Sequence, residues 1–188
     1  MVIFISVLVC AALVGIDQFL KYLVIEYLKP IEYYDVIDGV LRLRYVENTG
    51  AVFGSFATHT MLLTVFSLVL LGFTIYFLYT NKGKSKLMNV CMLLMISGGI
   101  GNIIDRVRLH YVVDYIEPTF VRFAVFNFAD CLITVGAFVL IGYLIYDIIK
   151  DVKKGRAEKA EADIASDKEE LASKEHSPDN NKAGDENE

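Results

Sequence analysis

Four long apolar stretches separate the polar parts of this 188-residue chain. They cover residues 2–28, 60–80, 87–104 and 124–146, and each is close to the roughly 20 residues that a helix needs to cross a bilayer core. The second stretch carries no charged residue over its whole length. The pattern predicts an all-α membrane protein with four transmembrane helices.

A polar insert at about residues 30–57 separates the first two predicted spans. Residues 33–37 and 40–46 contain alternating apolar and polar positions, and the Asp38-Gly39 pair between them favours a tight hairpin turn. We therefore expect a small external β-hairpin or sheet on the outer membrane surface. A second external segment, residues 110–126, is aromatic and mixed in character, which suits the interfacial zone.

The net charge of −5 comes from the C-terminal tail. Residues 151–188 hold 7 Lys/Arg and 12 Asp/Glu, whereas residues 1–150 hold 11 of each. The tail has almost no large apolar residue, so we expect it to be disordered and assign residues 1–150 to one membrane domain. The balanced charge of that domain suggests no nucleic-acid partner.

Basic residues near the ends of the predicted spans indicate the orientation. The short link at residues 81–86 contains three lysines, and the tail opens with Lys150, Lys153 and Lys154. Because cytoplasmic loops are enriched in Lys and Arg, the pattern places both segments, and both termini, in the cytoplasm.

Three cysteines, Cys10, Cys91 and Cys131, lie in apolar stretches and are interpreted as free thiols. The sequence around Cys10 (LVCA) resembles a lipobox, but no positive charge precedes it and Val9 is bulky where a small residue is needed. We expect this segment to be retained as a membrane helix. Because the three histidines are scattered, we predict no metal site and no cofactor.

Charged residues inside a span are costly, about 2.5–3.5 kcal/mol each on insertion scales. The charged positions that stand out in or next to the spans are Asp17 with Lys21, Asp105 and Asp130. From an inner start near Val2, Asp17 lies about 22 Å along the first helix at about 1.5 Å per residue. Asp105 follows the third predicted span directly, and Asp130 lies in the first turns of the fourth. All three acidic sites are therefore expected in one layer near the outer face.

An Asn-x-x-Asp pattern occurs twice, as Asn102 with Asp105 and as Asn127 with Asp130. This spacing places an amide and a carboxylate on one helix face. Two apposed carboxylates in a low-dielectric site share one proton. The ionised one can then activate a water while the neutral one protonates a scissile carbonyl. The pattern predicts Asp105 and Asp130 as the catalytic dyad of an aspartic protease.

Simpler interpretations compete with this one. Asp17 and Lys21 can form an ion pair that lets a charged helix insert, and Asp105 can mark an interfacial helix end. Asp114 is the main rival for a place in the dyad, but it lies outside the predicted spans. Two other protein classes also fit. A transporter or channel subunit needs polar residues through the whole membrane depth, and a non-catalytic assembly factor needs no matched Asn/Asp pairs.

Five motifs together resemble the lipoprotein signal peptidase family, the type II signal peptidases. In chain order they are Asp17-Gln18-x-x-Lys21, Asn48-x-Gly50-Ala51-x-Phe53, Gly98-Gly99-x-Gly101-Asn102-x-x-Asp105-Arg106, Val112-Val113-Asp114 and Phe126-Asn127-x-Ala129-Asp130. The chain departs from the usual family pattern at Ser97 and Tyr115, neither of which belongs to the proposed chemistry.

The resemblance implies an intramembrane aspartic endopeptidase that cuts diacylglyceryl-modified prolipoproteins just before the lipidated cysteine. It implies Asp105 and Asp130 as the catalytic pair. It implies further residues that line or support the site, namely Asp17, Lys21, Asn48, Gly50, Asn102, Arg106 and Asn127. The expected enzyme is a monomer in the bacterial cytoplasmic membrane, in contact with membrane lipid, with its active site toward the outer face and no cofactor or metal.

Overall fold

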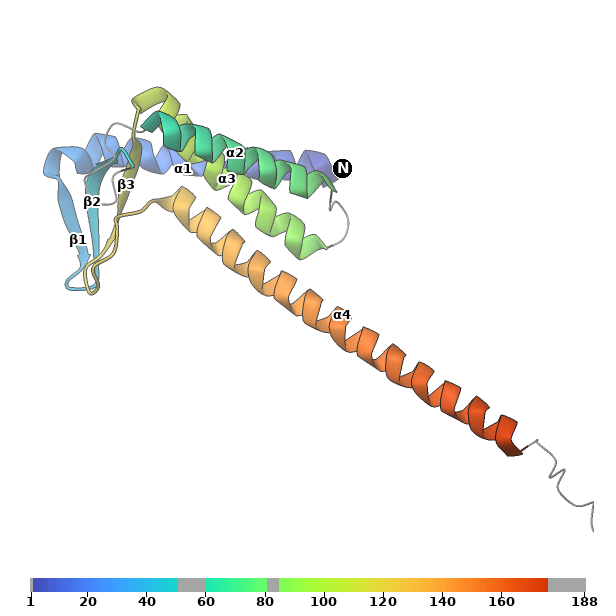
Figure 1. Cartoon of the computed structure of the whole chain (residues 1–188). Coiled ribbons are helices and arrows are strands. Elements are labelled where there is room, and N and C mark those ends of the chain that lie inside the picture. The colour runs from blue at the N-terminus through green and yellow to red at the C-terminus, as the bar shows by residue number, and fades with distance from the viewer. Residues whose placement is uncertain (1, 51–59, 81–84, 176–188) are drawn as a thin grey trace, which may run out of the picture. The chain divides into compact units, whose positions relative to one another are not determined.

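The computed structural model describes residues 2–50, 60–80 and 85–175 (Figure 1). Its contacts divide the chain into two units, Met1–Tyr143 and Leu144–Glu188. The candidate site residues belong to the first unit. Part of the family-like loop (Ala51 and Phe53), part of the lysine-rich link (residues 81–84) and the end of the tail lie outside the described residues.

The described part of the chain contains four α-helices. These helices are α1 (Val2–Leu23), α2 (Thr60–Thr80), α3 (Lys86–Leu109) and α4 (Phe128–Glu175). Helix α1 is extended by a short π-helix, η1 (Val24–Leu28), and a 3-10 turn, η2 (Lys29–Ile31).

Three of the described helices are long and apolar enough to cross a membrane, over Phe4–Ile31, Lys86–Leu109 and Phe128–Arg156. The described side chains of α2 form a shorter apolar stretch, Thr64–Thr80. Three of the predicted spans are therefore confirmed as helices that could cross a membrane, and the span predicted over residues 60–80 stays a prediction.

Large apolar side chains project outward from these helices. Phe138 on α4 is 73% exposed, and Phe4 on α1 is 68% exposed. Such surfaces are unfavourable in water but fit the hydrocarbon of a bilayer, where apolar contact with lipid replaces burial in a protein core.

Side-chain capping sets where α3 and α4 begin. The Ser85 hydroxyl accepts a hydrogen bond from the Met88 N–H at the start of α3. Asn127 Oδ1 accepts from the Asp130 N–H at 2.9 Å, so α4 begins at Phe128 rather than at the predicted residue 124. α3 ends later than predicted, at Leu109, where His110 takes a left-handed conformation with φ 68°.

Residues 151–175, the described part of the tail, are helical. Helix α4 continues without a break through residues 151–175 and ends at Glu175. Ala, Glu and Lys are strong helix formers, and Lys154 and Glu158 form an i,i+4 pair at 3.6 Å. A polar sequence without a core-facing stripe can still continue a helix that an apolar span has already nucleated, because only nucleation is costly.

The external insert folds as the predicted hairpin, with a third strand that the sequence did not reveal. Strands β1 (Tyr33–Ile37) and β2 (Leu41–Asn48) pair antiparallel, and Gly39 in their turn has φ 72°. The third strand, β3 (Val112–Pro118), pairs antiparallel with β2 and gives the order β1-β2-β3. Figure 1 shows these three strands together at one end of the helices of the first unit.

Two kinds of packing hold the first unit together. Between the sheet and the end of the first span lies a hydrophobic cluster of Val24, Leu28, Val113 and Tyr115. Helix α3 packs against both α1 and α2, and glycines bring α3 and α4 close together. A Cβ at Gly136 would lie 2.7 Å from the Cys91 carbonyl oxygen, and one at Gly98 would collide with the Ala129 carbonyl. These positions therefore require glycine.

Candidate active site

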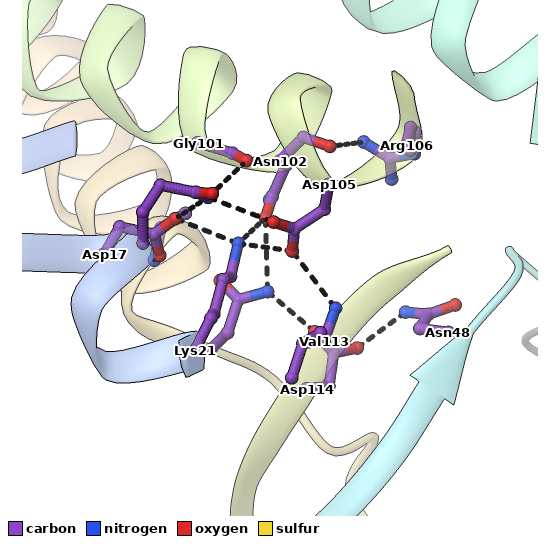
Figure 2. A network of polar contacts seen from close by, with 12 residues as sticks. Asp17, Lys21, Asn48, Gly101, Asn102, Asp105, Arg106, Val113 and Asp114 are labelled. Atoms are coloured by element: carbon purple, nitrogen blue, oxygen red, sulfur yellow. Dashed lines mark hydrogen bonds and ion pairs between the residues drawn. The ribbon is translucent and has the colours of Figure 1, made fainter. Parts of the chain in front are cut away.

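A buried polar network lies where α1, α3, β3 and the start of α4 meet (Figure 2). The buried polar side chains of the described residues are almost all part of it: Asp17, Lys21, Asn102, Asp105, Asp114 and Asn127. Buried charges and amides persist only when their partners satisfy them, so each contact in this network carries information about its role.

Lys21 is the centre of the network. Its Nζ lies 2.9 Å from Asp17 Oδ2 and 2.9 Å from Asp105 Oδ2, and it donates a hydrogen bond to Asn102 Oδ1 at 3.0 Å. The ammonium has three donors, and these three oxygens match them in number. One buried cation is thereby held between two carboxylates and an amide.

Asp105 is also fixed by two neutral donors. The Gln18 Nε2 group donates to Asp105 Oδ1 at 3.0 Å, and the backbone N–H of Val113 donates to Asp105 Oδ2 at 3.1 Å. With the Lys21 ion pair, Asp105 therefore joins α1 and α3 to strand β3.

Asp17 joins α1 to the start of α4, because its Oδ1 accepts a hydrogen bond from the Ala129 N–H at 3.1 Å. This contact needs Gly101 on α3, where a Cβ would collide with the Asp17 carboxylate. Gln18 supports the same junction by donating to the Gly101 carbonyl at 3.2 Å. The helix packing and the polar network thus depend on each other.

Two amides connect the carboxylates of Asp114 and Asp130. Asn127 Nδ2 donates to Asp114 Oδ1 at 2.7 Å and to Asn102 Oδ1 at 3.2 Å. Asn102 Nδ2 in turn donates to Asp130 Oδ1 at 2.8 Å, and the backbone N–H of Asn127 donates to Asp130 Oδ2 at 3.2 Å. Among the described residues, neither carboxylate forms an ion pair, in contrast to Asp105.

Asp114 lies on β3 and is 1% exposed. Its Oδ2 accepts a hydrogen bond from Asn48 Nδ2 at 2.7 Å. Burial raises the pKa of Asp114 to about 6, the Asn48 hydrogen bond opposes this rise, and the nearby Asp130 charge adds to it. Asn48 is itself oriented by the Gly50 N–H, which donates to Asn48 Oδ1 at 2.8 Å with Gly50 at φ 96°.

Arg106 is placed beside this group by α3. Its guanidinium contacts the Asn102 carbonyl at 3.4 Å and Ser67 Oγ at 3.5 Å, and it interacts electrostatically with Asp130 and Asp114. It supplies positive charge close to the carboxylates without a direct ion pair.

The structure therefore brings described residues of all five motifs together, but it pairs them differently from the sequence prediction. Asn102 contacts Asp130 rather than acting on Asp105, and Asp114 belongs to the same amide network. The sequence motif contains Gln18 but predicts no separate role for it. Its position next to Asp17, a charged residue inside a predicted span, was the signal that could have identified it. Among the described residues, no group of three or more His, Cys, Asp or Glu is placed to hold a metal ion.

The fold and the site define a multi-pass membrane enzyme that works with carboxylates. The sequence profile of the family described as "Signal peptidase (SPase) II" matches residues 9–146. A lipoprotein signal peptidase of Caldanaerobacter subterraneus subsp. tengcongensis is 43% identical over 139 residues, which cover 74% of this chain and 94% of that protein. The chain belongs to the signal peptidase II family of aspartic proteases.

Other comparisons agree. A lipoprotein signal peptidase of Streptococcus thermophilus is 38% identical over 130 residues, covering 69% of this chain and 85% of that protein. Two solved structures, each described as a bacterial membrane enzyme structure by the in meso method, have a TM-score of 0.71 and 29% identity. They cover 78% and 77% of this chain and 90% and 95% of their own chains. The transporter and assembly-factor alternatives are thereby set aside.

Proposed function

We propose that this protein removes the signal peptide from diacylglyceryl-modified prolipoproteins by hydrolysing the peptide bond before the lipidated cysteine, with Asp114 and Asp130 as the catalytic pair. Cleavage of prolipoprotein signal peptides is the activity of the family. The observation that carries the choice of dyad is the amide bridge from Asp114 through Asn127 and Asn102 to Asp130.

This proposal revises the dyad predicted from the sequence. Asp105 lies 2.9 Å from the Lys21 ammonium and also accepts from Gln18 and Val113. The Lys21 ammonium and these two donors already occupy both oxygens of Asp105, so it is poorly placed to share a proton with a second carboxylate. Its contacts also leave little capacity to bind a water. Asp105 is better suited to holding the site together.

Asp114 and Asp130 have the properties that Asp105 lacks. Both oxygens of each accept hydrogen bonds from neutral N–H groups, which orient the carboxylates without fixing their charge. The raised pKa of Asp114 suits it to hold the shared proton and act as the general acid, which leaves Asp130 the role of general base in the proposed pair.

The reaction then follows from these two states. A water held between the carboxylates loses a proton to Asp130 as its oxygen attacks the scissile carbonyl carbon, and Asp114 donates its proton to the carbonyl oxygen. When the tetrahedral intermediate collapses, Asp114 takes a proton back from a hydroxyl of the gem-diol, Asp130 gives its proton to the leaving nitrogen, and the C–N bond breaks. Arg106 and the amides stabilise the charge that develops. The two steps return both carboxylates to their starting states, so this scheme requires no cofactor.

A cleavage assay with the purified protein tests the substrate class. A precursor that carries diacylglyceryl on its lipobox cysteine should be cut, and the same precursor without the lipid should be cut at least about a hundredfold more slowly, because binding energy from the lipid positions the scissile bond. Mass spectrometry of the products gives the cleaved bond. Equal rates for the two precursors, or a cut elsewhere, would contradict the proposal.

We further propose four spans, with both termini in the cytoplasm, the active site toward the outer face of the bacterial cytoplasmic membrane, and a monomer surrounded by lipid. The 21 residues of α2 carry no charge, and Lys86 together with the lysines of the tail supports the orientation. Residues 1–150 form the catalytic domain in this scheme and residues 151–188 a cytoplasmic tail.

Cysteine labelling in intact cells tests this topology. In a background without the three native cysteines, Val40→Cys in the exposed β1–β2 turn should react with a membrane-impermeant maleimide, and Lys86→Cys should react only after the membrane is opened. The two positions are matched by their exposure. Labelling of residue 86 in intact cells would reverse the orientation.

A further inference from the structure

Strand β2 contains a bulge. Leu43 pairs with Ile116, but Val46 pairs with Asp114, so three steps along β2 match two steps along β3. The extra residue falls around Tyr45, whose N–H donates to the Glu32 carbonyl at 2.9 Å.

The bulge decides which side chains of β2 face Asp114. If the pairing of Leu43 continued without a bulge, Tyr45 would lie opposite Asp114 and Asn48 would point to the other face of the sheet. With the bulge, Val46 and Asn48 share the face of Asp114, and Asn48 Nδ2 reaches Asp114 Oδ2 at 2.7 Å. The position of one extra residue therefore controls a contact to the active site.

A group of side chains holds the residue in the bulge. Tyr45 Oη lies 2.9 Å from Glu47 Oε1 and 3.2 Å from Tyr111 Oη. Lys29 Nζ donates to the same Glu47 oxygen at 3.0 Å and lies 5.0 Å from the centroid of the Tyr45 ring. A carboxylate can only accept, so the single Tyr45 proton is directed to Glu47 and Tyr111 donates to Tyr45.

The rings of both tyrosines are anchored. Tyr45 and Tyr111 pack against the hydrophobic cluster between the sheet and the first span. Tyr111 directly precedes β3, and Lys29 belongs to the turn that follows the span. The group thus ties the bulge to the two elements that flank it.

We propose that Tyr45, Tyr111, Glu47 and Lys29 form a positioning cluster that fixes the β2 bulge and so aims Asn48 at Asp114. The inference rests on the proposed catalytic role of Asp114. None of the four residues contacts the carboxylate pair in the described structure, so they act on the reaction through Asn48.

Removal of single hydroxyl groups tests the proposal. Tyr45→Phe and Tyr111→Phe should each lower kcat by about tenfold and leave KM within about twofold. The first variant removes the hydrogen bond to the Glu47 carboxylate and the second removes the bond that orients the Tyr45 hydroxyl, while the substrate contacts stay. Tyr34→Phe, at an exposed tyrosine of β1, is the matched control and should keep full activity.

The pH profile separates positioning from general loosening. The Asn48 hydrogen bond lowers the pKa of Asp114, so its loss should shift the kcat/KM profile to higher pH. The charged groups that act on Asp114 from the other elements are Lys21, Arg106 and Asp130, and the variants leave them unchanged. A lower rate with an unmoved profile would overturn the proposal.

A double-mutant cycle with Asn48→Ala gives the sharpest result. If Tyr45 acts through Asn48, then Tyr45→Phe should cause almost no further loss in the Asn48→Ala background. Full additivity would overturn the positioning role while leaving the dyad intact. An Asn48→Ala variant with wild-type activity would instead count against both Asn48 and the proposed role of Asp114, so the two failures are distinguishable.

Glu47 provides a second route if a tyrosine variant folds poorly. Glu47→Gln retains an oxygen that accepts from Tyr45 and should keep most of the activity, whereas Glu47→Leu should resemble Tyr45→Phe in both kcat and pH profile. Equal activity of the Gln and Leu variants would contradict the cluster.

Discussion

Asp114→Asn and Asp130→Asn should each lower kcat for a diacylglyceryl-modified precursor by at least about a thousandfold, and the double variant should be little worse than either single one. Asn is nearly isosteric with Asp and keeps one of its two acceptor oxygens, but it cannot store or transfer the shared proton. The two carboxylates act as a unit, so losing either removes the whole proton-transfer step.

Asp105→Asn distinguishes the two possible dyads. We expect this variant to lose stability, because Lys21 then keeps only one carboxylate, but to lower kcat by only about tenfold once folded protein is compared with folded protein. The measurement is single-turnover cleavage by purified variants whose monodispersity and thermal midpoints have been matched. An inactive Asp105→Asn together with an active Asp114→Asn would restore the pair that the sequence suggested.

Lys21→Met should destabilise the protein by about 3–5 kcal/mol, because it leaves two buried carboxylates without their cation. The side chain of Lys21 is 3% exposed and those of Asp17 and Asp105 are 0% and 3% exposed, so water cannot compensate for the missing charge. The free energy of unfolding in detergent, with unfolding induced by heat or denaturant, measures the effect.

A compensating variant tests the cause of this loss. Lys21→Met combined with Asp17→Asn and Asp105→Asn removes all three charges and should recover much of the stability, since neutral groups of similar shape can replace a buried ion pair. Lys154→Met, which removes an exposed partner at 75% exposure, should have almost no effect. If the triple variant were no more stable than Lys21→Met, lost packing rather than unpaired charge would be responsible.

The broad architecture was predictable from the sequence because membrane spans and hairpin turns are local signals. A charge-free run such as residues 87–104 indicates a membrane-crossing helix by length and composition, and Asp38-Gly39 indicates a turn from two residues. The family resemblance rested on short motifs in order, and the comparisons confirmed it.

The pairing inside the site was not predictable, because it depends on contacts between distant segments. The repeated Asn-x-x-Asp spacing suggested that Asp105 and Asp130 are equivalent. In the structure, Lys21 reaches across from α1 and pairs with Asp105, and this breaks the symmetry. Asp114 lies outside the predicted spans, so it was not expected beside the helix ends. The pairing of β3 with β2 places it there.

The contact between Asp17 and the Ala129 N–H joins residues 112 positions apart, and it has a consequence for biogenesis. During synthesis the first span enters the membrane long before residue 129 exists. In that interval Asp17 and Lys21 can neutralise each other within one helix turn, so the nascent helix exposes no unpaired charge at these two residues to lipid. Asp130 is the last of the four aspartates of the polar network to be translated. Under the proposed dyad, an incomplete chain that ends before residue 130 lacks one of its two catalytic carboxylates, so we expect it to be inactive.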